Sequence, residues 1–140
     1  MSVADTNVLV HSTAPGSPDH ARARAALSRL ASQGPIAVSR QILREYIAAT
    51  TRPQSWSRAF TLAEATSDTD AFAQRFTVLE DGPPVWRQLM AFSQRIVFGG
   101  KQVHDANIVA TMLAYGETRL LTFNGADFRR FGSLIQVVVP

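Results

Sequence analysis

The sequence predicts an α/β fold in which a central parallel sheet carries helices on both faces. Short apolar runs alternate along the chain with longer segments of helical periodicity, the order expected of parallel sheets. The first apolar run ends directly on an acid, Asp5, and ligands of such sheets bind at the carboxyl ends of the strands. No repeat or linker divides the 140 residues, so we expect one domain, residues 1–140.

Two strands are expected in the first forty residues. The first lies in the stretch Val3–Val10 and ends at Asp5, and the segment Ser12–Asp19 is rich in proline and glycine, which predicts a loop. Alanine and arginine dominate Asp19–Ala31, which predicts a helix, and a Gly-Pro pair ends it. The short apolar run Ile36–Val38 follows and is the second predicted strand.

The middle of the chain is predicted to be largely helical. A helix is expected over about Arg40–Thr50, because Ser39 can cap its first turn. Its apolar side holds Ile42, Leu43, Tyr46 and Ile47. Further helices are expected over Ser57–Ser67 and Thr69–Arg75, and Phe76–Leu79 is the third predicted strand.

A proline turn precedes the next predicted helix, Val85–Val97, since proline suits a first helical turn. The expected apolar side of this helix holds Trp86, Leu89, Met90 and Ile96. After a glycine loop, another helix should run from Asp105, or just after it, to about Tyr115, with Gly116 as its C′ residue. The last predicted elements are a strand at Arg119–Thr122, a loop with a helical turn at Asn124–Phe131, and a strand at Ile135–Val139.

The composition excludes several classes of protein. There is no cysteine, so a disulfide, a zinc–cysteine site and a thiol nucleophile are excluded. No segment resembles a signal peptide and no apolar run could span a bilayer, so we expect no membrane association and a cytoplasmic location. The net charge is +3 and Lys101 is the only lysine, so arginines supply the rest of the basic charge, which slightly favours a nucleic acid partner.

Four acids stand where a metal site would need them. Asp5 closes a strand, Asp105 opens a helix, Asp127 follows the fourth predicted strand, and Glu45 lies near the buried border of its helix. Each alone also has a structural explanation, as a cap, a loop carboxylate or a solvated helix residue. Together they would repel one another unless a hard cation such as Mg²⁺ or Mn²⁺ binds to them.

These acids lie in motifs that resemble those of PIN-domain ribonucleases, and most of all the VapC-type toxins of bacterial type II toxin–antitoxin pairs. The motifs are Asp5–Val10, Leu43–Tyr46, Val103–Ala110 and Leu121–Phe128. The resemblance covers essentially the whole chain. It implies a PIN-like three-layer α/β/α sandwich around a central parallel sheet.

The resemblance also implies a role for each matched residue. Asp5, Glu45 and Asp105 match acidic metal-site positions, and Asp127 is the expected fourth acid. Asn124 is its rival, either as a neutral ligand or as a hydrogen-bond donor to a ligand. Supporting positions are Thr6 and Thr122, whose hydroxyls would line the site, and Asn7, which would steady the first loop.

The implied activity is Mg²⁺-dependent hydrolysis of RNA phosphodiester bonds by a carboxylate-bound metal and an activated water, with Mn²⁺ able to substitute. The implied partners are a VapB-like antitoxin and a second copy of the chain. A housekeeping PIN nuclease and a non-catalytic RNA- or protein-binding PIN module stay open as alternatives. A haloacid-dehalogenase-type phosphatase is disfavoured, because it would need an aspartate where Asn7 stands.

Other side chains are candidates for contacts with nucleic acid. Trp56 and Trp86 could stack on bases, and we expect Trp86 to pack into the core and Trp56 to be exposed. His104 stands beside Asp105 and could act in catalysis, but a surface or capping role is favoured. A phosphate backbone or an antitoxin could contact the arginines at positions 22, 24, 40, 44 and 52.

Overall fold

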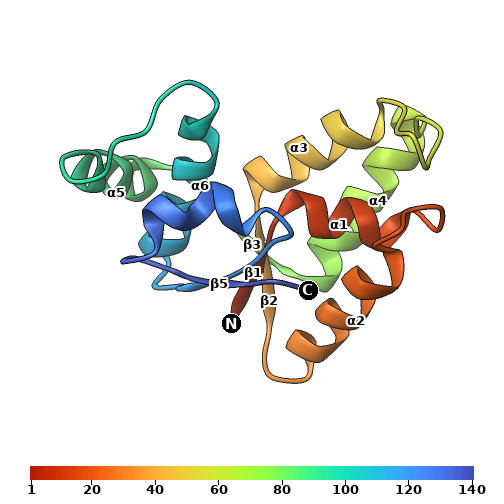
Figure 1. Cartoon of the computed structure of the whole chain (residues 1–140), viewed down its shortest axis with the longest axis horizontal. Coiled ribbons are helices and arrows are strands. Elements are labelled where there is room, and N and C mark those ends of the chain that lie inside the picture. Colours follow the sequence, from red (N-terminus) through yellow and green to blue (C-terminus); the bar gives the residue numbers. More distant parts are fainter.

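A parallel sheet of five short strands forms the centre of the computed structural model, which describes residues 1–140 (Figure 1). The strands are β1 (Ser2–Ala4), β2 (Ile36–Ser39), β3 (Thr77–Leu79), β4 (Arg119–Leu121) and β5 (Gln136–Val138). Their order is β3-β2-β1-β4-β5, so β1 is central, and Val3 pairs with Ala37 of β2 and Leu120 of β4. All three residues are completely buried, as expected where helices cover both faces of a sheet.

Helices flank the sheet in the predicted three-layer α/β/α arrangement. They are α1 (Thr6–Thr13), α2 (His20–Ala31), α3 (Arg40–Thr50), α4 (Leu62–Arg75), α5 (Pro83–Ser93), α6 (Gln102–Ala114) and a 3₁₀ helix, η1 (Gly125–Phe131). Figure 1 shows α1, α2 and α4 on one side of the sheet and α5, α6 and η1 on the other. The predicted α/β class and parallel sheet are therefore confirmed. None of the helices combines the length and the apolar composition that a membrane span requires.

Helix α1 was not predicted. It begins one residue after β1, and the expected loop at Ser12–Asp19 is wrong for Ser12 and Thr13, which are helical. β-Branched residues with low intrinsic helix propensity are common in this segment. Tertiary burial of Val8, Leu9 and Val10 overrides that propensity.

The two helices predicted at Ser57–Ser67 and Thr69–Arg75 are wrong, because a single helix, α4, covers Leu62–Arg75. The start of α4 is fixed by a capping box, in which the Thr61 hydroxyl accepts from the Glu64 amide at 3.1 Å and the Glu64 carboxylate accepts from the Thr61 amide at 3.0 Å. Residues 51–61 form a loop instead.

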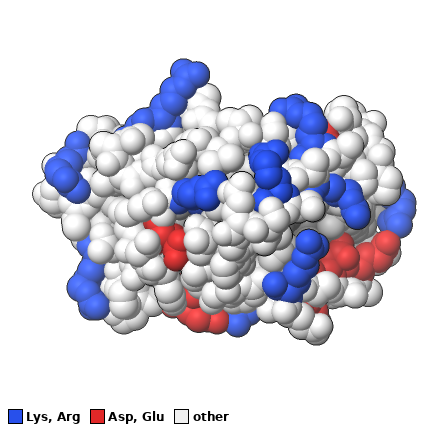
Figure 2. Space-filling view, turned by 90° about the horizontal axis from the view of Figure 1, so that it is seen from below, with Lys and Arg blue, Asp and Glu red and all other residues white.

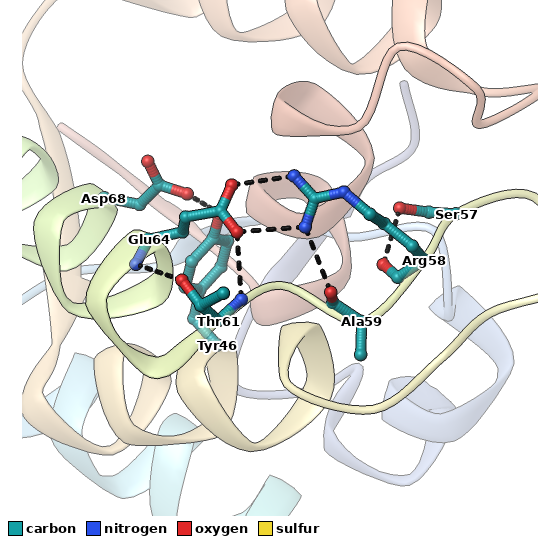
Figure 3. A network of polar contacts seen from close by, with 7 residues as sticks. All are labelled: Tyr46, Ser57, Arg58, Ala59, Thr61, Glu64 and Asp68. Carbon is teal, nitrogen blue, oxygen red and sulfur yellow. Dashed lines mark hydrogen bonds and ion pairs between the residues drawn. The ribbon is translucent and has the colours of Figure 1, made fainter.

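Polar contacts hold the end of this loop against α4 (Figure 3). The Arg58 guanidinium donates to both oxygens of the Glu64 carboxylate, at 2.9 and 2.8 Å, and to the carbonyl oxygen of Ala59 at 3.1 Å. Nearby, the buried Tyr46 hydroxyl donates to Asp68 at 2.7 Å and joins α3 to α4. The loop that leads from α3 to α4 is therefore anchored at its C-terminal end.

Helix α5 ends at Ser93, earlier than predicted, and its expected apolar side is partly wrong. Trp86 is 61% exposed and Met90 is 39% exposed, so neither packs into the core. The buried positions are Val85, Leu89 and Phe92. Their spacing of four and three residues places them on one side of the helix, and α5 packs against α6.

Helix α6 begins at Gln102, three residues before the predicted start, so Asp105 lies in its first turn. Its predicted end is confirmed, since Gly116 adopts a positive φ of 73° after the last turn. In α3, three members of the predicted apolar side, Ile42, Leu43 and Tyr46, are buried in the core.

Candidate functional site

Asp5 lies at the junction of β1 and α1 and is 6% exposed. Its Oδ1 accepts from the Thr6 amide at 2.8 Å, so the carboxylate also caps α1. Its Oδ2 accepts from the Thr122 hydroxyl at 2.8 Å and from the Asn7 side-chain amide at 3.2 Å. The carboxylate is therefore held in one orientation at the carboxyl end of the central strand.

Asn7 and Thr122 join the ends of β1 and β4. The Asn7 amide donates to the Thr122 hydroxyl at 3.1 Å, and the Asn7 carbonyl oxygen accepts from the Phe123 amide at 3.0 Å. The Thr122 hydroxyl also accepts from the Asn124 amide at 3.0 Å. These bonds cross-link two segments more than a hundred residues apart in the sequence.

Glu45 projects from α3 towards the same strand ends. Its Oε2 accepts from the Thr6 hydroxyl at 2.8 Å and its Oε1 accepts from the Gln41 amide at 2.9 Å. The Gln41 amide also donates to the His104 carbonyl oxygen at 2.8 Å, and its own oxygen accepts from Asn107 at 2.9 Å. Gln41 thus links α3 to α6 behind Glu45.

Gln41 was not among the residues predicted for the site. The signal was available, because a residue four positions before Glu45 shares its helix face and a glutamine can hydrogen-bond a carboxylate there. The His104 side chain is exposed, and its backbone carbonyl makes the contact with Gln41.

The electrostatic environment shows that the acids interact. Burial raises the pKa of the Asp5 carboxyl to about 6, and the nearby negative charge of Glu45 also raises it, against hydrogen bonds that lower it. Partial burial raises the pKa of Asp105 to about 6 as well, and the charges of Asp5, Asp127 and Glu45 add to that rise. A positive charge among these groups would lower the pKa values of both Asp5 and Asp105.

Asp5, Glu45 and Asp105 line one cavity of about 480 Å³ together with Thr6, Asn7 and Asn124. Trp56 and His11 also line it. The Trp56 side chain is half-buried there, so the expectation that it would be exposed is wrong. Asp127 does not line the cavity; it lies exposed in η1 and acts on Asp105 through its charge.

No lysine or arginine lines this cavity. Figure 2 shows the opposite face, viewed towards the amino-terminal ends of the strands, and basic side chains are spread across it. Among the arginines considered above, Arg40 pairs with Glu80 and Arg22 pairs with Asp19. No lysine or arginine therefore neutralises the carboxylates from within the cavity.

The donor set fits a hard divalent cation, since three carboxylates and several neutral oxygens face one cavity. In this structure no three of these acids lie close enough together to coordinate one metal ion. Glu45 instead turns to Thr6 and Gln41, its nearest hydrogen-bond donors. Mutual repulsion of the carboxylates explains this open arrangement.

The fold and the spacing of these acids define a class of protein, and comparison with known families identifies it. The profile of the PIN domain family matches residues 2–134, so the chain belongs to the PIN domain family. No curated protein matches the chain in sequence.

Solved structures with the same fold include several toxin–antitoxin proteins. One is VapC20 from Mycobacterium tuberculosis, described as a toxin that cleaves the sarcin–ricin loop (19% identity, TM-score 0.70, 100% of both chains). Another is VapBC2 from Rickettsia felis bound to promoter DNA (18% identity, TM-score 0.68, 99% of this chain and 98% of that chain). A third is a toxin–antitoxin complex from Klebsiella pneumoniae (20% identity, TM-score 0.68, 99% and 96%).

Replacing Gln41 by leucine should lower any activity of this cavity by about tenfold to a hundredfold, the effect typical of residues that orient a metal ligand. Gln41 is buried and donates to Glu45 Oε1, so its loss would free that oxygen and leave Thr6 as the only donor to the carboxylate. Turnover at saturating metal should fall, and the metal affinity should weaken.

The matched control is Arg40→Ala, which changes the preceding residue but removes only an exposed pair with Glu80. This variant should keep wild-type activity and metal affinity. Equal effects of the two substitutions would show that Gln41 has no special role in orienting Glu45.

Proposed function

We propose that this protein is a Mg²⁺-dependent endoribonuclease and the toxin of a VapBC-type toxin–antitoxin pair. The observation that carries this proposal is the single cavity that Asp5, Glu45 and Asp105 line together and to which no lysine or arginine contributes. A phosphodiester cannot approach three carboxylates unless a cation neutralises them. Magnesium is the ion that carboxylate sites most often share with phosphate substrates, and Mn²⁺ can substitute.

In this proposal each residue has a distinct role. Asp5, Glu45 and Asp105 would hold the metal, and Asp127 would add a fourth negative charge. Thr122 and Asn7 orient Asp5, while Thr6 and Gln41 orient Glu45. The bound cation would supply charge neutralisation and Lewis-acid activation of a water for attack on phosphorus.

Family membership and the structural relatives support this function over other uses of the scaffold. A relative of the same fold and length is described as an RNA-cleaving toxin, and others are toxin–antitoxin complexes. A housekeeping nuclease would share the cavity but lack the antitoxin. A non-catalytic module would have no need for Asp5 to be oriented by three donors. We propose that the protein acts in the cytoplasm.

Cleavage assays test the activity directly. The purified chain should cleave single-stranded RNA with Mg²⁺, lose that activity with EDTA, regain it with added Mg²⁺ or Mn²⁺, and leave a chromogenic phosphate monoester intact. Cleavage that persists with EDTA would overturn the metal proposal. Hydrolysis of the monoester alone would instead identify a phosphatase.

The fourth ligand can be tested by comparing two variants. Asp127→Asn should weaken Mn²⁺ binding in calorimetric titration more than Asn124→Ala does, because only the first removes a negative charge. Asn124 lines the cavity and Asp127 does not, so the comparison separates the effect of charge from that of a place in the cavity wall. A larger loss with Asn124→Ala would assign the fourth position to the neutral side chain.

The antitoxin and a second copy of the chain are the proposed protein partners. Ile42, Leu43 and Tyr46 of α3 are buried in the core, so of the apolar side of this helix only Ile47 is partly accessible to a partner. A partner arginine or lysine over the acidic cavity would compete with the metal. Excess Mg²⁺ should then relieve inhibition by the antitoxin in a ribonuclease assay. Separately, light scattering of the purified chain should give the mass of a dimer. Inhibition unchanged by Mg²⁺, or a strictly monomeric mass, would contradict these proposals.

A further inference from the structure

The cavity has an aromatic wall beside its acidic residues. Trp56, from the loop between α3 and α4, and His11, from α1, both line the cavity that holds the carboxylates. Their ring centroids are 5.1 Å apart with the planes inclined by 38°. His11 in turn meets the Phe123 ring edge-on at 5.1 Å. Aromatic surface is thus present next to the site proposed for phosphate chemistry.

This aromatic wall is held in place from several directions. The backbone around Trp56 forms a tight turn, in which Gln54 and Ser57 exchange backbone hydrogen bonds of 2.8 and 3.3 Å. Gly16 packs so closely that a Cβ there would clash with the Trp56 carbonyl oxygen. His11 is fixed by a hydrogen bond of 2.6 Å between its Nδ1 and the Ser17 hydroxyl.

The Arg58 contacts of Figure 3 anchor the same loop two residues beyond Trp56. The Trp56 side chain nevertheless stays only half-buried, because one part of it borders the cavity. A preorganised aromatic side chain of this kind loses little conformational entropy when a flat ligand stacks on it.

We propose that Trp56 is the stacking platform for an unpaired RNA base adjacent to the phosphate that the acidic residues process. The proposal rests on the proposed ribonuclease function and names its substrate class as RNA with unstacked bases. Aromatic side chains stack on any base, because every base has a π-face. Bases inside an RNA duplex are already stacked on both faces and cannot enter the cavity.

Fluorescence can follow this contact directly, because Trp56 and Trp86 are the only tryptophans. Trp86→Phe leaves Trp56 as the sole emitter and changes an exposed residue of α5 that does not line the cavity. Adding Asp105→Asn to this variant prevents turnover during the titration. The probes are a short single-stranded RNA of mixed sequence, a ribose–phosphate chain of the same length without bases, and the RNA annealed to its complement.

Single-stranded RNA should quench Trp56 emission, and the abasic chain and the duplex should leave it unchanged. In the Asp105→Asn background, Trp56→Ala should weaken binding of the single strand about tenfold, measured by fluorescence anisotropy of labelled RNA, and leave binding of the abasic chain unchanged. Trp56→Phe should restore most of the affinity. Equal quenching by the abasic chain, or equal affinity of Trp56→Ala for the single strand, would overturn the proposal.

Thermal unfolding shows whether Trp56→Ala is folded. If it is not, the quenching of intact Trp56 and the affinity of Trp56→Phe decide the question. Cleavage of single-stranded RNA by the wild-type protein is measured in parallel. Cleavage without quenching overturns the stacking platform alone, whereas base-dependent quenching without cleavage supports the platform and overturns the nuclease proposal.

Discussion

Asp5→Asn is expected to abolish Mg²⁺-dependent RNA cleavage while the metal-free protein becomes more stable at pH 7. The substitution keeps the shape of the side chain and removes the charge at the most buried of the proposed metal ligands. Loss of one preorganised electrostatic group at a reaction centre costs about 10²–10³ in rate. For Asp5→Asn we expect the rate to fall by at least the upper value of this range, because Asp5 would hold the metal itself.

The stability gain follows from the raised pKa. The Asp5 carboxyl has a pKa of about 6 in the folded protein against 3.8 ordinarily, so the folded state holds its proton more tightly than the unfolded chain does. The protonated Asp5 carboxyl therefore favours the folded state. This contribution to the free energy of unfolding is fully present below pH 3.8 and is lost as the pH rises through about 6. At pH 7 the ionised carboxylate therefore costs up to about 3 kcal/mol, at 1.4 kcal/mol per pKa unit.

Asparagine avoids this cost, although its amide nitrogen cannot accept the bonds that one carboxylate oxygen accepts. We therefore expect a net gain of about 1 kcal/mol in urea unfolding at pH 7. This gain should shrink as the pH falls through about 6 and become a net loss near pH 4, where the folded wild-type carboxyl is protonated and only the lost hydrogen bonds count. The matched control is Asp70→Asn, an exposed acid of α4, which should change neither activity nor stability. Full ribonuclease activity in Asp5→Asn would refute the proposed site.

The affinity for Mn²⁺ is expected to fall by up to a hundredfold for each pH unit below about 6. Asp5 and Asp105 both have pKa values of about 6, and a cation must displace any proton that either one carries. Each displaced proton contributes up to about a tenfold loss per pH unit, and above about pH 7 the affinity should become constant.

Calorimetric titration at several pH values between 5 and 8 measures this dependence, and buffers of different ionisation enthalpy count the protons released. Asp5→Asn removes one of the two groups, so the dependence should fall to about tenfold per pH unit. An affinity for Mn²⁺ that does not change between pH 5 and pH 7 would show that these two carboxyls are not the ligands.

The sequence determined the class of fold because its signals were local. Apolar strands such as Ile36–Val38 are buried whichever strand they pair with, and turns rich in proline and glycine separate them from amphipathic helices. The wrong elements were those in which local propensity and tertiary burial disagree. Helix α1 forms although many of its residues are β-branched, because the core buries its apolar side chains. In α5, Trp86 was predicted to be buried because it is a large aromatic residue, but it is exposed.

For the site, the sequence indicated Asp5, Glu45, Asp105 and Asp127 through the order and spacing of their motifs. Only the tertiary structure decided how their surroundings are built, because each contact joins elements distant in the chain. Gln41 links α3 to α6, Thr122 links β4 to Asp5, and the loop between α3 and α4 brings Trp56 to the same cavity. Local periodicity carries no information about such contacts. The pKa values of Asp5 and Asp105 likewise depend on burial and on charges from several elements, which the chain brings together only when it folds.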